Sequence, residues 1–268
     1  MFKIGWLRIA NGLIYLYILA PLAVVIISSF HPGEYLIFPP QGFSWRWYEH
    51  VLMSGRYTEP FWNSVKIAVV TTCFSLPIGT LAAYALTRYD FRFKNAVQSL
   101  FLSPLVIPTL LFGIGLLIMF SALGVKMYFT RLVLAHIVLT IPYVVRTMLA
   151  SFSQINRSIE EASVVLGASP ARTFWLVTLP QVKSALAASA FISLVMSFDE
   201  LVVALFLTGP GLNTLPIMIY SDIQFNLSPS IAAISSLVIV ATLAIGALLI
   251  IFMQQRTRKS TDIEDPKP

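Results

Sequence analysis

Two adjacent carboxylates, Asp199 and Glu200, lie in the otherwise apolar stretch "FISLVMSFDELVVALFLT". Such groups can bind a cation or exchange a proton. One charge near the centre of a bilayer costs about 2.5 to 3.5 kcal/mol on insertion scales, so the pair should face protein or water rather than lipid. A stripe of small and polar residues at helical spacing supports this expectation. Its members are Ser189, Ser193, Ser197, Glu200, Ala204 and Thr208.

Two interpretations of the carboxylates stay open. Asp199 and Glu200, with Ser197 and Ser193, line the path of a cationic substrate, or the two acids serve assembly. In the second case they pair with an Arg or Lys of another span or subunit, or cap a break in a helix. His136 lies in another apolar stretch and is expected to hydrogen-bond a neighbouring helix rather than relay a proton. We expect neither a catalytic residue nor a metal site, because no His or Cys has metal-ligand spacing.

A second polar stretch, "EEASVVLGASPARTFWLVTLP" at 160–180, interrupts the apolar sequence. Ser158 and Glu161 have the spacing of a capping box, which predicts that a helix begins at Ser158. Gly167 is suited to the left-handed residue that ends a helix. Ser169 and Pro170 are suited to the N-cap and first position of a second helix, which runs to Leu179 and Pro180. This helical hairpin, with exposed glutamates and an apolar edge, is either a docking surface or a capped loop folded on the membrane.

Composition assigns these stretches to a membrane protein. Of 268 residues, 57% are hydrophobic and only 11% charged, and the mean hydropathy is +0.81. Long apolar runs without alternation predict an all-α polytopic fold, because lipid cannot satisfy an open backbone. The first apolar run is expected to be a retained span rather than a signal peptide. Six spans are predicted, at roughly 9–29, 64–87, 98–122, 131–152, 184–208 and 230–253.

The distribution of Lys and Arg predicts the orientation. With both termini in the cytoplasm, thirteen of the 18 Lys and Arg residues lie inside. This topology explains the net charge of +6, so we expect lipid and no nucleic acid as a partner. The chain then forms one transmembrane domain, 1–268. Its segments outside the spans are an outer loop at 30–60 with a short amphipathic helix, a cytoplasmic loop at 153–183, an outer loop at 209–229 and a disordered polar tail at 254–268.

The polar stretch resembles a family signature: Glu-Ala-Ala, three residues, Gly, nine residues, Ile, one residue, Leu-Pro. Here the matching positions are Glu161, Ala162, Ser163, Gly167, Val177, Leu179 and Pro180. Ser163 and Val177 depart from it conservatively. The signature is typical of permease subunits of type I binding-protein-dependent ABC importers. The resemblance implies a bacterial inner-membrane subunit whose 153–183 loop, with Glu160 beside the signature, inserts into a cytoplasmic ATPase.

The resemblance also implies the partners. These are a second permease subunit, expected to differ from this one, two ATPase subunits and an extracytoplasmic solute-binding protein. ATP and Mg²⁺ belong to the ATPases, and this chain needs no cofactor and is no enzyme. Around Asp199 the sequence resembles the spermidine and putrescine class, so a polyamine is the expected solute. Opines, amino acids and aminophosphonates stay open as alternatives. An ion-coupled secondary transporter would leave the hairpin unexplained, and no motif supports an intramembrane enzyme.

Overall fold

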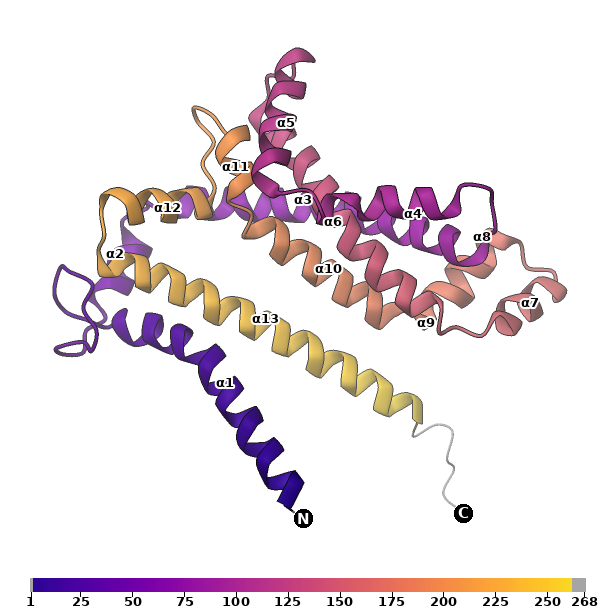
Figure 1. Ribbon diagram of the computed structural model, residues 1–268, viewed down its shortest axis with the longest axis horizontal. Coiled ribbons are helices and arrows are strands. Elements are labelled where there is room, and N and C mark those ends of the chain that lie inside the picture. The colour runs from indigo at the N-terminus through magenta and orange to yellow at the C-terminus, as the bar shows by residue number, and fades with distance from the viewer. Residues whose placement is uncertain (1, 262–268) are drawn as a thin grey trace. The chain divides into compact units, whose positions relative to one another are not determined.

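The computed structural model of the protein describes the backbone of residues 2–261 and the side chains of residues 6–251 and 253. Its elements are all helical, as the apolar runs predict (Figure 1). In order they are α1 (Phe2–Ser28), α2 (Arg46–Met53), α3 (Thr58–Arg88), α4 (Lys94–Leu102), η1 (Ser103–Leu105), α5 (Thr109–Ala122), α6 (Tyr128–Phe152), α7 (Arg157–Val165), α8 (Pro170–Thr173), η2 (Phe174–Thr178), α9 (Leu179–Gln181), α10 (Lys183–Phe198), α11 (Val202–Leu207), α12 (Leu215–Phe225) and α13 (Pro229–Thr261).

Four helices are long and apolar enough to cross a membrane: Trp6–Ser28, Thr58–Arg88, Tyr128–Phe152 and Pro229–Ile251. Two further pairs, Lys94–Leu105 with Thr109–Ala122 and Pro170–Gln181 with Lys183–Phe198, are bent by 102° and 78°. If each bent pair is one span, the described residues contain six, the number predicted. The bend in the first pair lies beside Pro104 and Pro108, where the missing amide hydrogens interrupt the helical ladder.

Two details of the prediction are wrong. The helix expected to continue to residue 208 ends at Phe198, and α11 is a separate helix. The 254–268 tail was expected to be disordered, but α13 continues through Thr261. The remainder of that tail lies outside the described residues.

One compact unit contains the described residues up to Pro60 together with Met218–Ala247. The predicted amphipathic helix in the outer loop is present as α2, which buries Trp47 and Val51. Hydrogen bonds to α12 (Leu215–Phe225) fix the end of this loop. The buried carboxylate of Asp222 in α12 accepts hydrogen bonds from the Arg56 guanidinium and from the Tyr57 hydroxyl, the latter at 2.6 Å. The Asp222 carboxylate raises the pKa of the Arg56 guanidinium.

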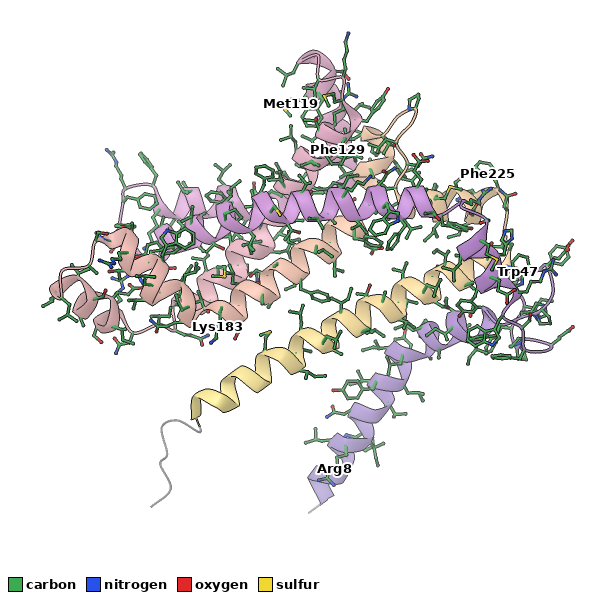
Figure 2. All side chains as sticks on the ribbon, turned by 180° about the vertical axis from the view of Figure 1, so that it is seen from behind. Arg8, Trp47, Met119, Phe129, Lys183 and Phe225 are labelled. Atoms are coloured by element: carbon green, nitrogen blue, oxygen red, sulfur yellow. The ribbon has the colours of Figure 1, made fainter. Side chains whose placement is uncertain are left out.

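The larger unit contains Phe61–Ile217 and the described residues from Leu248 onward. Helices α6 and α10 pack on one another within it (Figure 1). One apolar core joins α3, α5, α6 and α11 through Ile67, Phe120, Leu132 and Val203, and Phe129 packs against it (Figure 2). A second core surrounds the fully buried Phe152 at the end of α6 and includes Phe174 of η2. These cores position the hairpin and the carboxylates.

Candidate functional site

The hairpin at residues 157–181 consists of α7 followed by the continuous turns of α8, η2 and α9. Asn156 caps α7, because its side-chain oxygen accepts from the Ser158 amide at 3.1 Å. The predicted capping box at Ser158 is therefore wrong by two residues. Asparagine is as good an N-cap as serine. Here Asn156, two residues before Ser158, has an extended backbone and occupies the N-cap position.

The turn of the hairpin agrees with the prediction. Gly167 has φ = +91°, a conformation that residues with a side chain rarely adopt. Ser169 caps the second helix by accepting from the Arg172 amide at 3.3 Å, and Pro170 is its first residue. Residues Phe174–Thr178 then widen into a π-helix, which the sequence did not indicate. Such segments occur often at functional sites.

Two side-chain contacts hold the halves of the hairpin together. The hydroxyls of Ser163 and Thr173 lie 3.1 Å apart, and Thr178 Oγ1 donates to Glu160 Oε1 at 2.7 Å. Glu160 is buried and forms an ion pair with Arg88, so the expectation of two exposed glutamates holds for Glu161 alone. Helical spacing does show that the adjacent residues Glu160 and Glu161 point about 100° apart. It does not show that an Arg from a distant helix meets one of them.

The outer surface of the hairpin is apolar and hollowed. Val165 and Leu166, next to the turn, are 85% and 88% exposed. A depression of about 410 Å³ lies beside them. Its lining contains four of the seven signature positions, Ala162, Ser163, Gly167 and Val177, together with Ile159, Leu166, Ala168 and Arg172. Exposed apolar side chains around a hollow are the usual features of a surface that binds another protein.

The predicted polar stripe is only partly continuous. Ser189, Ser193 and Ser197 are buried on one side of α10, so this part does face the protein interior, as predicted. Because α10 ends at Phe198, Glu200 is not on the same helical face. Its carboxylate instead accepts from the Val203 amide at 3.0 Å, at the beginning of α11. Capping a helix break was one of the roles left open for this residue, and its hydrogen bond from the Val203 amide is a contact of that kind.

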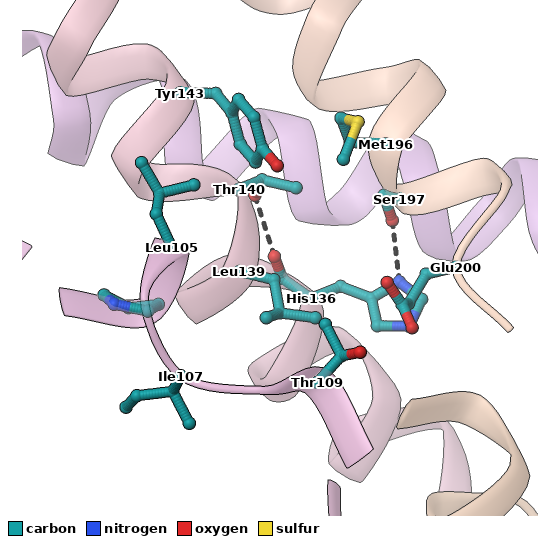
Figure 3. A pocket seen from close by; sticks show the side chains of 11 residues that line it. Leu105, Ile107, Thr109, His136, Leu139, Thr140, Tyr143, Met196, Ser197 and Glu200 are labelled. Carbon is teal, nitrogen blue, oxygen red and sulfur yellow. Dashed lines mark hydrogen bonds between the residues drawn. The ribbon is translucent and has the colours of Figure 1, made fainter. Parts of the chain in front are cut away.

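The serines connect α10 to two neighbouring helices of the larger unit. The hydroxyls of Ser193 and Ser75 of α3 lie 2.8 Å apart. Ser197 Oγ lies 2.8 Å from His136 Nδ1 of α6, which confirms that this histidine hydrogen-bonds a neighbouring helix (Figure 3). His136 Nε2 is buried without a partner among the described residues. The polar row is thus the seam along which α10 packs.

A cavity of about 110 Å³ opens beside this seam (Figure 3). Polar groups of Glu200, Ser197, His136, Thr140 and Tyr143 line it, together with Met196 and residues of the bend around Pro104. His136, Thr140 and Tyr143 recur at four and three residues along α6. Sequence reasoning missed the last two, although this spacing is the signal that identifies them. Oxygen acceptors and a carboxylate around a small cavity suit a water molecule or an ammonium group.

Asp199 lies at the exposed side of the same break. Among the described residues, neither Asp199 nor Glu200 forms an ion pair with a Lys, Arg or His. Assembly by pairing with a cation of another span therefore has no support within this part of the chain. The break leaves one acid exposed and directs the other towards the cavity.

Comparisons with known proteins show the family to which the chain belongs. Residues 75–260 match the family described as the inner membrane component of binding-protein-dependent transport systems. The chain is 31% identical over 248 residues to the spermidine/putrescine transport system permease protein PotC of Escherichia coli strain K12, covering 92% of this chain and 94% of PotC. It is also 31% identical over 242 residues to the putrescine transport system permease protein PotI of the same strain, covering 88% and 85%.

A solved structure has the same fold. It is the bacterial alginate ABC transporter in complex with alginate pentasaccharide-bound periplasmic protein, at a TM-score of 0.71 and 17% identity, covering 97% of this chain and 96% of that one. The extent of the family match and the length of the similarity to PotC show the family. The protein belongs to the inner-membrane permease components of binding-protein-dependent ABC importers.

Proposed function

We propose that this permease subunit forms the pathway for a polyamine such as spermidine or putrescine. The observation that carries the proposal is the pair of carboxylates at the break between α10 and α11, where Asp199 is exposed and Glu200 lines the cavity. Polyamines are cations with amines at both ends, so acids on the route lower the cost of removing each ammonium group from water. The similarity to two permeases named for polyamine transport supports the same solute.

We further propose that the 157–181 hairpin is the part of the subunit that a cytoplasmic ATPase binds. Its exposed apolar residues and the hollow lined by the family signature support this role. The excess of Lys and Arg on one side supports a cytoplasmic location for the hairpin and for both termini. In the complete importer, two ATPase subunits hold ATP and Mg²⁺, a second and different permease completes the pathway, and the binding protein delivers the solute. The chain 1–268 then acts as one transmembrane domain.

The substrate is tested by uptake into proteoliposomes that contain the complete importer and its binding protein. Asp199→Asn and Glu200→Gln remove the charges and keep the shapes of the side chains. We expect uptake of radiolabelled spermidine or putrescine to fall strongly in both variants while the complex is purified in normal yield. Asp90→Asn is the control, because Asp90 is an exposed acid remote in sequence from the break. Unchanged uptake in both pathway variants would remove the two acids from the route.

The docking surface is tested by a cross-link. Cys73 is free and exposed, so it is first replaced by Ala. A single cysteine is then introduced by Leu166→Cys at the exposed turn of the hairpin. We expect a bifunctional thiol reagent to join it to the ATPase subunit in the purified complex, and Leu123→Cys, exposed in a different loop, to give no such product. A product from Leu123→Cys alone would place the ATPase elsewhere.

A further inference from the structure

The guanidinium of Arg88, the last residue of α3, is enclosed by the hairpin. Its Nε donates to Glu160 Oε2 at 2.6 Å and its Nη2 donates to Glu160 Oε1 at 3.0 Å. The two residues are 72 positions apart in sequence, and their side chains are only 7% and 11% exposed. Two parallel hydrogen bonds fix the direction of a contact as well as its distance. This ion pair therefore holds α7 in one orientation relative to the end of α3.

Three more hydrogen bonds converge on the same place. Arg88 Nη1 donates to the Phe152 carbonyl at the end of α6, at 3.2 Å. Arg157 Nη2, at the beginning of α7, donates to the Thr87 carbonyl at 2.6 Å. Thr178 of the π-helix donates to the carboxylate that Arg88 already binds. Both halves of the hairpin are thus tied to the ends of α3 and α6.

Apolar packing surrounds these polar ties. The ring of Tyr84 in α3 lies 5.6 Å from that of Phe152 and 4.8 Å from that of Phe174 in η2, each in an edge-on arrangement. Phe152 is fully buried. Close-packed interiors transmit a displacement instead of absorbing it. The polar contacts and the ring cluster together make a stiff joint between α3 and the hairpin.

The covalent link from the hairpin to α10 is less regular. The second half of the hairpin contains the π-helix and Pro180, and at Val182 the helix axis turns by 78° before α10 continues. In contrast, α3 continues as one helix of 31 residues through its own proline, Pro77, and its last residue is part of the joint. A displacement of the hairpin therefore has a stiffer route into α3 than into the helix that follows it in sequence.

We propose that Arg88 and Glu160 are positioning residues that make the hairpin and α3 move as one body, so that the closing of the ATPase pair is passed into α3. This inference rests on the proposed docking of the hairpin on the ATPase. It adds a route from the hairpin into α3, a helix that is not adjacent to the hairpin in sequence. Ser193 and Ser75 then extend the route, because their hydroxyls join α3 to the helix that leads to Asp199 and Glu200.

The decisive variant is the double change Arg88→Met with Glu160→Leu. Replacing both members of a buried ion pair by apolar residues of similar size often leaves a fold as stable as before, whereas removing one member strands a charge. We expect the double variant to assemble with the ATPase and to hydrolyse ATP. We expect the solute moved per ATP hydrolysed to fall roughly tenfold, because the closing of the ATPase pair is then no longer passed into α3.

The matched control is the other ion pair near the end of α3, Asp90 with Lys94. The pair joins residues four apart, the exposed Asp90 in the loop after α3 and the partly exposed Lys94 at the start of α4, and Lys94 lowers the pKa of Asp90 by its hydrogen bond. Asp90→Asn with Lys94→Gln removes it and should leave the ratio of transport to hydrolysis unchanged. A normal ratio in the Arg88→Met, Glu160→Leu variant would overturn the proposal. The Leu166→Cys cross-link is made in parallel, so that absence of docking is recognised separately.

A distance measurement that leaves Arg88 and Glu160 in place tests whether the hairpin and α3 move together, even if the double variant does not fold. Spin labels are attached at Ser158 near the beginning of α7, outside the lining of the hollow, and at Phe74 of α3, both exposed, in the Cys73→Ala background. Between the nucleotide-free and vanadate-trapped complexes we expect their separation to change by less than about 2 Å, because the hairpin and α3 then move together as the ATPase pair closes. A change of about one helical turn, 5.4 Å, would show that the hairpin slides past α3 and would refute the joint.

Discussion

The Glu200 carboxylate accepts a hydrogen bond from the Val203 amide across the break that separates α10 from α11. The contact gives this acid a structural role that does not depend on its charge. The amides in the first turn of any helix lack partners within the helix, and a side-chain oxygen three residues before Val203 supplies one. The same side chain also lines the cavity, so its two roles need to be separated by experiment.

Glutamine and alanine at position 200 separate these roles. Glu200→Gln keeps an oxygen acceptor and should retain the melting temperature of the purified complex while uptake of spermidine falls. Glu200→Ala loses the hydrogen bond to the Val203 amide as well, and we expect it to cost about 1 kcal/mol of stability, the usual net value of a hydrogen bond. Differential scanning fluorimetry of both variants measures the difference. Equal melting temperatures for Gln and Ala would show that the hydrogen bond contributes nothing to stability.

The hydrogen bond between His136 and Ser197 should show a measurable coupling energy. Both side chains are buried, at 1% and 3% exposed, and the bond joins α6 to α10. Hydrogen bonds between membrane helices contribute about 0.6 kcal/mol on average and about 1.7 at most. We therefore expect a double-mutant cycle of His136→Leu and Ser197→Ala to give a value in that range from thermal unfolding in detergent. A coupling energy of zero would mean that the hydrogen bond between the two residues does not contribute to stability.

Some features of this chain could be predicted because they depend on local sequence. The lipid-spanning segments follow from apolar length, and the turn of the hairpin follows from Gly167, Ser169 and Pro170, whose backbone preferences act over one or two residues. The row of Ser189, Ser193 and Ser197 was correctly expected to face inward, since small polar residues at helical spacing pack against other helices. The amphipathic α2 was recognised from aromatic and apolar residues close together in the outer loop, Trp45, Trp47, Tyr48, Val51 and Leu52.

Other features depend on partners that are distant in sequence. Nothing near Glu160 indicates that Arg88 will bury it, because the pair exists only when α3 and α7 have folded together. The capping box was misplaced because Asn156 and Ser158 are both good caps, and the backbone conformation that decides between them is not visible in residue types. The break after Phe198 was missed because it contains neither Gly nor Pro, the residues that usually announce one.

Close packing of α3 against α6 at Gly79 should not tolerate a methyl group. A Cβ at this position would lie 2.7 Å from both Cβ and Cγ1 of Val144, which is fully buried in α6 and cannot move aside easily. We expect Gly79→Ala to destabilise the protein by about 1 to 3 kcal/mol, the usual cost of overpacking. Gly115→Ala is the control, because nothing lies within 4 Å of its Cβ position. A Gly79→Ala variant that melts no earlier than the Gly115→Ala variant would contradict the packing.

Valine at Gly167 should uncouple transport in a way that backbone strain alone does not explain. Gly167 and Gly124 both have positive φ, +91° and +67°, and nothing lies within 4 Å of a Cβ at either position. Valine is strained at both positions, each at a cost in the range of about 1 to 3 kcal/mol. Only Gly167 lies in the hollow of the hairpin, so the added side chain would also lie within the surface that we propose binds the ATPase.

The two variants should consequently have similar stability and different function. We expect Gly124→Val to support uptake per ATP hydrolysed close to that of the unaltered importer. Gly167→Val should remain in the membrane but lose the ATPase subunit on purification, or hydrolyse ATP without uptake. Glu161→Lys, on the exposed face of α7, should act in the same direction without straining the backbone, because it reverses a charge at the docking surface. Normal transport by both Gly167→Val and Glu161→Lys would mean that the ATPase does not act through this hairpin.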